Sequence, residues 1–137
     1  MDAHHSIDQV AKRTGLTAYT LRYYERIGLL APVARAAGGQ RVYAPSDMAW
    51  LEFLLRLRTT HMSIGKMQKF AKLRSDGDST IGERRQLLED HLQDVQAEIL
   101  AMQNAVAALE DKIAHYRELE TKEDFSVCLT AVINREP

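Results

Sequence analysis

The 137-residue sequence has a single cysteine, three prolines and no long run of apolar residues. One cysteine excludes a disulfide within the chain, and it cannot by itself close a soft-metal site. No apolar stretch approaches the length of a membrane span, and the first residues lack the basic flank and hydrophobic run of a signal peptide. A glycine-rich phosphate loop is also missing, and the cysteine has no evident catalytic histidine. These absences predict a cytoplasmic protein that is not an enzyme and that has no cofactor, metal or membrane partner.

Charge is divided unevenly along the chain, although the formal net charge is only −1. Residues 1–75 contain 12 Lys/Arg and 5 Asp/Glu, a net charge of about +7. Residues 76–137 contain 6 Lys/Arg and 14 Asp/Glu, a net charge of about −8. A basic half of this kind favours contact with a polyanion such as nucleic acid. Chance segregation of charge on a solvated surface is the alternative.

The segment 16–30 is predicted to form a short helix with two different faces. Thr17 is suited to the N-cap, and Gly28 is suited to end the helix. One side repeats apolar residues at a spacing of three, namely Leu21, Tyr24 and Ile27. The other side carries no acid and consists of Tyr19, Arg22, Tyr23 and Arg26. Guanidinium groups match phosphate oxygens and guanine edges, so we expect this face to lie on DNA. An ordinary amphipathic helix with a solvated face is the alternative.

A preceding helix is expected from Ser6, which has capping-box spacing to Gln9, to Gly15. Two short helices joined this tightly are typical of a helix-turn-helix, whose second helix enters the major groove. A generic helical hairpin would have the same periodicity. The pair of histidines at positions 4 and 5 is expected to belong to a disordered end.

Residues 33–43 predict a two-stranded wing around the turn at 36–39. Arg35 and Arg41 lie near its tip and Tyr43 near its base, and a wing with arginines beside a recognition helix would grip the sugar-phosphate backbone. A plain surface hairpin is the alternative. Ser46 is then expected to cap a third, largely apolar helix, on which Arg56 and Arg58 can extend to solvent, or Arg58 can reach a phosphate. Ser63 is expected to cap a fourth helix, with inward residues Ile64, Met67, Phe70 and Ala71.

The most regular pattern in the chain is a heptad seam between residues 88 and 116. Its apolar residues are alternately four and three positions apart: Leu88, Leu92, Val95, Ile99, Met102, Val106, Leu109, Ile113 and Tyr116. A helix over about residues 81–120, opened by Thr80 as a cap, would be roughly 60 Å long. Because no small domain can bury so long a stripe, we predict a homodimer through a coiled coil. The spacing does not choose between parallel and antiparallel pairing, and a helix folded back on its own front domain is the alternative.

These patterns predict three segments. Residues 1–75 form a DNA-binding domain, residues 76–120 a linker and dimerisation helix, and residues 121–137 a short tail that begins charged and becomes apolar. Cys128 in the tail is either a sensor thiol or a structural cysteine. Its apolar neighbours Val127 and Leu129 favour an inert, buried thiol.

Three strings resemble the DNA-binding region of the MerR family of bacterial transcription regulators: GLTAYTLRYYERIGLLAPVAR, GGQRVYAPSDMAWLEFLLRLR and HMSIGKM. The resemblance covers residues 6–74 and is strongest to the branch that responds to aldehydes and other electrophiles. It implies an all-α, mainly helical fold, with a winged helix-turn-helix followed by a long helix that pairs antiparallel with its dimer mate. It also implies a homodimer on a pseudo-palindromic promoter, which bends and untwists an over-long spacer for bacterial RNA polymerase.

The resemblance further assigns site residues. On the recognition helix these are Thr17, Ala18, Tyr19, Arg22, Tyr23 and Tyr24; on the wing they are Arg41 and Tyr43, and on the third helix Arg58. Arg56 stands where electrophile-responsive relatives often carry a cysteine, and His61 stands where glycine is common. The effector is left open.

Two other functions fit parts of the chain, namely a coiled-coil protein–protein adaptor and an architectural, excisionase-like DNA-binding protein. The Tyr/Arg helix is not needed by the first, and the long helix is not usual in the second.

Overall fold

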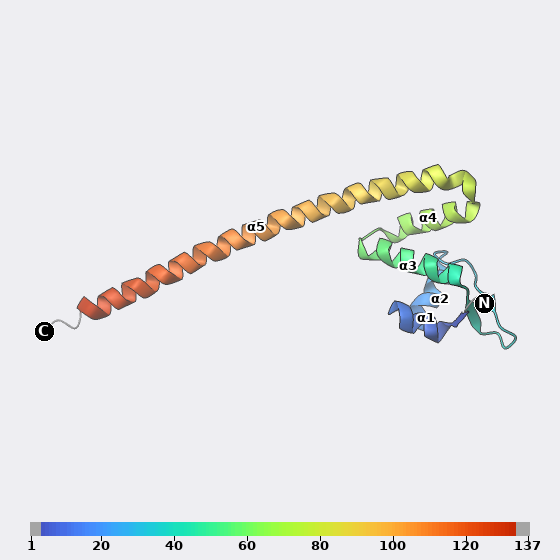
Figure 1. Cartoon of the computed structure of the whole chain (residues 1–137), viewed down its shortest axis with the longest axis horizontal. Coiled ribbons are helices and arrows are strands. Elements are labelled where there is room, and N and C mark those ends of the chain that lie inside the picture. The colour runs from blue at the N-terminus through green and yellow to red at the C-terminus, as the bar shows by residue number, and fades with distance from the viewer. Residues whose placement is uncertain (1–3, 134–137) are drawn as a thin grey trace. The chain divides into compact units, whose positions relative to one another are not determined.

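The computed structural model describes residues 4–133, with the backbone alone for 130–133. The elements are β1 (His5–Ser6), α1 (Ile7–Thr14), α2 (Ala18–Arg26), β2 (Ala34–Arg35), β3 (Arg41–Tyr43), α3 (Pro45–Thr59), α4 (Ile64–Asp76), the 3₁₀ turn η1 (Asp78–Thr80) and α5 (Ile81–Ile133) (Figure 1). They form two compact units, Met1–Leu92 and Gln93–Pro137, called here the first unit and the second unit. The mainly helical fold class predicted from the sequence is confirmed.

The first two helices begin and end at the predicted signals. The Ser6 hydroxyl accepts a hydrogen bond from the Gln9 N–H at 3.2 Å, and the Gln9 side chain accepts one from the Ser6 N–H at 2.9 Å. Gly15, with φ of +76°, closes α1 in the left-handed conformation that glycine adopts without strain. The Thr17 hydroxyl accepts from the Thr20 N–H at 3.1 Å and begins α2. The helix-turn-helix therefore follows from local capping.

The wing is a three-stranded antiparallel sheet in the order β1-β3-β2. β2 and β3 pair as predicted around the turn at 36–39, with Arg35 opposite Arg41. The third strand was not predicted: in β1, His5 pairs with Tyr43. The expectation of a disordered end is therefore wrong for His5, because its backbone joins the ladder of β3.

α3 begins one residue before the predicted cap. Ala44 occupies the N-cap, and its N–H donates to the Asp47 carboxylate at 2.9 Å. Pro45 takes the first helical position, where a missing N–H costs nothing. Ser46 is therefore inside the helix, and the prediction that it caps α3 is wrong.

α4 is capped as predicted, since the Ser63 hydroxyl accepts from the Lys66 N–H at 3.2 Å. Met67 and Phe70 face inward, whereas Ile64 is exposed, contrary to expectation. His61, in the turn before α4, has a φ of +65°. Its N–H donates to the Arg58 carbonyl at 3.0 Å, so it occupies the C′ position after α3, where glycine is usual.

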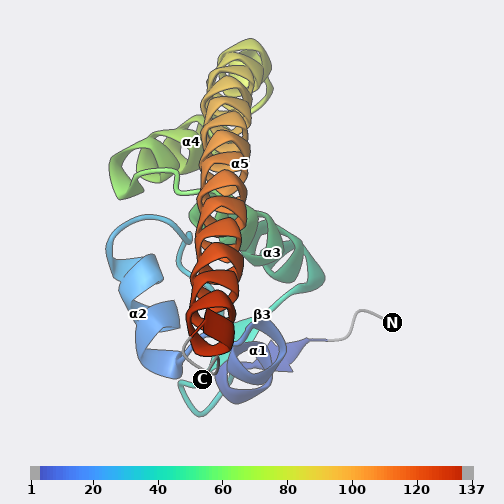
Figure 2. The ribbon, with the colours of Figure 1, turned by 90° about the vertical axis from the view of Figure 1, so that its left-hand side faces the viewer.

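One hydrophobic core holds the first unit together, and its residues come from α1, α2, α3 and α4. Figures 1 and 2 show the arrangement of these four helices. Trp50 of α3 stacks on Phe70 of α4, with ring centroids 5.7 Å apart and planes at 9°. The Trp50 indole N–H donates to the Leu29 carbonyl at 2.8 Å, so the segment after α2 is fixed to α3. Leu88, predicted as the first seam residue, is partly buried against this core.

α5 is longer than the sequence predicted. Residues 121–133 continue the helix, so the expected end near residue 120 is too early; the last residues of the predicted tail, 134–137, lie outside the described residues. Thr80 lies in η1 and turns its hydroxyl back toward α4, donating to the Leu73 and Gly77 carbonyls. Among residues 4–133, none of the helices combines the length and the hydropathy that a membrane span needs.

Candidate nucleic-acid interface

The outward face of α2 carries the side chains that the sequence predicted for DNA. Tyr19 is 71% exposed, and Thr17 and Arg22 are also exposed. Tyr23 is half-buried, and the Arg26 guanidinium lies 5.5 Å from the centroid of its ring. α2 thus presents hydroxyls, a flat aromatic surface and two guanidiniums on one side. These groups are the ones that bind phosphates and base edges.

Tyr24 combines a buried ring with a hydroxyl that makes a polar contact. Its ring belongs to the core, while its hydroxyl accepts a hydrogen bond from Arg58 Nη1 at 3.3 Å. Arg58 comes from α3 and is exposed. The structure therefore brings together two residues that lie far apart in the sequence and that were both predicted as contacts.

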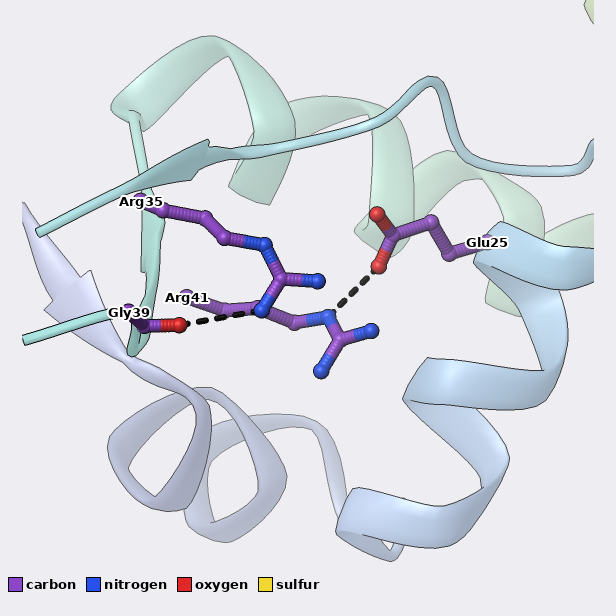
Figure 3. A network of polar contacts seen from close by, with 4 residues as sticks. All are labelled: Glu25, Arg35, Gly39 and Arg41. Carbon is purple, nitrogen blue, oxygen red and sulfur yellow. Dashed lines mark hydrogen bonds and ion pairs between the residues drawn. The ribbon is translucent and has the colours of Figure 1, made fainter.

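The wing places two arginines side by side next to α2. Arg41 Nε donates to Glu25 Oε2 at 2.6 Å, and the two side chains are only 20% and 13% exposed (Figure 3). Arg35 Nη1 donates to the Gly39 carbonyl at 2.9 Å across the wing turn. The Glu25–Arg41 ion pair therefore links the recognition helix to the wing.

Tyr43 differs from the prediction. Its side chain is 0% exposed, and its hydroxyl has no hydrogen-bond partner among the described residues. Burial raises the pKa of this phenol, the Glu25 carboxylate raises it further, and the Arg41 guanidinium opposes both. A side chain without surface cannot touch DNA in this conformation, so the predicted direct contact is wrong. Tyr43 instead anchors β3 in the core.

Sequence reasoning missed Glu25, because it described the exposed face of α2 as free of acids. Arg41 and Tyr43 are two residues apart on one strand, so their side chains share a face. The burial of Tyr43 turns that face toward α2 and its Glu25. The spacing was visible in the sequence, but the partner was not, since it depends on how the wing packs on α2.

Neither a cluster of metal ligands nor a buried thiol is found among the described residues. Among them, no group of three or more His, Cys, Asp or Glu side chains lies close enough to hold a metal ion. Cys128 is exposed on α5, so the expectation of a buried thiol is wrong for the single chain.

A helix-turn-helix whose recognition helix carries tyrosines and arginines beside an arginine-bearing wing defines a winged-helix DNA-binding protein. More narrowly, the chain belongs to the MerR family. Residues 5–74 match the family model described as "MerR HTH family regulatory protein", and residues 48–112 match the model "MerR, DNA binding".

Known relatives agree with this assignment. The transcriptional regulator AdhR of Bacillus subtilis is 44% identical over 88 residues, which cover 64% of this chain and 63% of AdhR. An uncharacterized HTH-type regulator of Haemophilus influenzae is 36% identical over 110 residues, covering 80% of this chain and 82% of that protein.

A solved structure gives the same result at the level of the fold. HiNmlR, described as a MerR family regulator lacking the sensor domain and bound to promoter DNA, has a TM-score of 0.78 and 34% identity to this chain. The superposition covers 87% of this chain and 94% of HiNmlR. The chain is thus a DNA-binding transcriptional regulator of a family whose members bind promoter DNA as dimers.

Proposed function

We propose that this regulator binds a pseudo-palindromic promoter as a homodimer, and that it bends and untwists the spacer between the two promoter elements. Bacterial RNA polymerase would then engage the realigned promoter elements. The observation that carries this proposal is the Tyr/Arg face of α2 beside the wing arginines, within a unit that has its own core. One such unit fits one half-site, with α2 in the major groove and the wing on the adjacent backbone.

The predicted contacts take different roles in this arrangement. Thr17, Ala18, Tyr19 and Arg22 lie at the start of α2 and would face the groove. Tyr23, Tyr24 with Arg58, and Arg41 would contact sugar and phosphate, which position the protein without reading sequence. Tyr43 takes no part in direct contact.

The seam supports the dimer. Its residues Ile99, Met102, Val106, Leu109, Ile113 and Tyr116 are between 46% and 68% exposed. Antiparallel pairing centred near Met102 would bring Ile99 opposite Val106, and Leu92 opposite Ile113. A two-fold axis in the protein then matches the two-fold symmetry of the promoter.

We further propose that transcription responds to a small effector or stress, in line with the resemblance to electrophile-responsive regulators. Arg56 occupies the position on the third helix where electrophile-responsive relatives often carry a cysteine, so Cys128 is the candidate for covalent sensing. We also propose that it acts in the cytoplasm, because a promoter-binding protein acts where the chromosome lies.

Binding to the promoter of its own gene tests the interface. Arg22→Ala should weaken binding about 10- to 100-fold at fixed salt, because one arginine contact to a base discriminates by about 1–3 kcal/mol. Arg85→Ala removes the same charge from α5, where Arg85 pairs with Glu89 at 2.9 Å, and should change little. Equal affinities of wild type and Arg22→Ala would count against the assignment of α2. In transcription in vitro from the same promoter, an electrophile should activate with wild type but not with Cys128→Ser if the thiol is the sensor.

A further inference from the structure

We propose that Glu25 is a positioning residue for DNA binding. It holds the Arg41 guanidinium at the junction of α2 and β3, so that the terminal N–H groups of Arg41 are presented to a backbone phosphate. This inference rests on the proposed function, since it assumes that α2 and the wing together contact DNA.

The geometry of the sheet creates the need for such a residue. Arg35 and Arg41 are directly opposite each other on β2 and β3, so both side chains stand on the same face. Like charges in this position repel, which would drive the two guanidiniums apart. Arg35 is held by its hydrogen bond to the Gly39 carbonyl at the turn. Arg41 is held by its ion pair with Glu25, which lies on α2.

The contact itself suits positioning. The Arg41 Nε to Glu25 Oε2 distance of 2.6 Å is that of a short, charge-assisted hydrogen bond. Both side chains are largely shielded, so water competes less for this pair than for an exposed ion pair. The bond uses Nε, and Figure 3 shows the carboxylate on that side of the guanidinium. The terminal nitrogens of Arg41 are thereby left for a phosphate, the fork geometry for which arginine is suited.

The direction in which DNA affinity changes when Glu25 is removed distinguishes a positioning role from a purely electrostatic one. An acid beside a DNA-binding surface repels phosphates, so its removal alone should strengthen binding and steepen the dependence on salt. If Glu25 only neutralises Arg41, Glu25→Ala therefore binds DNA more tightly. If Glu25 positions Arg41, the same variant binds less tightly, although the protein has become more positive.

A double-mutant cycle with promoter DNA, measured over a range of salt concentrations, provides the test. Glu25→Ala and Arg41→Ala should each weaken binding about 10-fold, the usual loss for a hydrogen bond to a charged group. The double variant should bind no worse than Arg41→Ala, because Glu25 acts through Arg41. Glu25→Gln keeps an acceptor oxygen and should restore part of the affinity. Glu52→Ala removes the same charge from the exposed Arg13–Glu52 pair, and it should not weaken binding.

Either of two results would overturn the proposal. One is that Glu25→Ala binds DNA as tightly as wild type or more tightly. The other is that removing Glu25 lowers the DNA affinity of Arg41→Ala as much as it lowers that of wild type. Thermal unfolding of each variant shows whether the fold is kept, and Glu25→Gln carries the test if Glu25→Ala does not fold. If Arg22→Ala and Arg41→Ala both bind like wild type, the proposed interface itself fails. If those two lose affinity while Glu25→Ala does not, only the positioning role fails.

Discussion

The two units of the chain differ in how far their apolar side chains are exposed to solvent. In the first unit these side chains converge from four helices on one core, and Val10, Leu21 and Leu51 have no exposed surface. In the second unit the apolar residues of α5 form a stripe that is about half exposed. A lone helix cannot bury its own stripe. The first unit is therefore complete within one chain, whereas the second requires a partner, for which a second copy of the same seam is the natural choice.

The largest predicted effect removes that partner. Ile99→Glu with Val106→Glu places charges in the centre of the seam, where burial of an unpaired carboxylate is strongly unfavourable. We expect the dimer dissociation constant to rise by at least about 100-fold and binding to palindromic DNA to fall with it. Sedimentation velocity measures the first effect and a gel shift the second. The first unit should keep its fold, because its core contains neither residue.

A matched control places the same two charges away from the seam. Ala97→Glu with Ala108→Glu changes exposed positions on the opposite side of α5, and it should leave the dimer intact. If the seam variant still sediments as a dimer, or if both variants dissociate alike, the heptad seam is not the interface.

A smaller effect is expected at the turn between α3 and α4. His61 adopts a φ of +65°, a conformation that costs a residue with a Cβ about 1–2 kcal/mol relative to glycine. The gain is reduced because glycine also makes the unfolded chain more flexible. His61→Gly should therefore raise the free energy of unfolding by about 1 kcal/mol in urea titrations. His61→Ala keeps the Cβ and should give no gain, and an equal gain from both variants would mean that the backbone strain is not the cause.

Local signals explain why much of this fold was predictable. Ser6, Thr17 and Ser63 cap their helices by contacts within three residues, so their roles can be read from short strings. The heptad seam is equally local. The seam indicates which side of a helix packs against a partner, but it does not indicate where the helix ends. α5 therefore continues past Tyr116, the last residue of the seam, through Glu120 and Glu123 to Ile133.

Contacts made by tertiary packing were not predictable. The β1 strand exists only because β3 lies beside it, and the Glu25–Arg41 pair joins residues that are brought together by the packing of the wing on α2. Tyr43 was assigned to DNA by family resemblance alone. Its burial became visible only once the core was assembled.

The smallest effect concerns the Tyr43 hydroxyl, a buried polar atom in the hydrophobic core of the first unit. Because no described residue accepts or donates a hydrogen bond to it, Tyr43→Phe removes a desolvated group without breaking a contact. At pH 7 we expect stability to stay level or to rise by up to about 1 kcal/mol. A loss of more than that in urea unfolding would show that the hydroxyl has a partner in solution.

The same substitution should alter the response to alkaline pH. Burial raises the pKa of Tyr43 above its ordinary value of 10.0, so the folded protein keeps the phenol proton at a pH where the unfolded chain releases it. Stability contributed by the neutral phenol is fully present below pH 10 and is lost as the pH rises toward the higher pKa of the folded state. Tyr43→Phe lacks this loss. Its advantage over wild type should therefore widen between pH 9 and about pH 11 in urea unfolding; a constant difference would mean that the phenol ionises alike in both states.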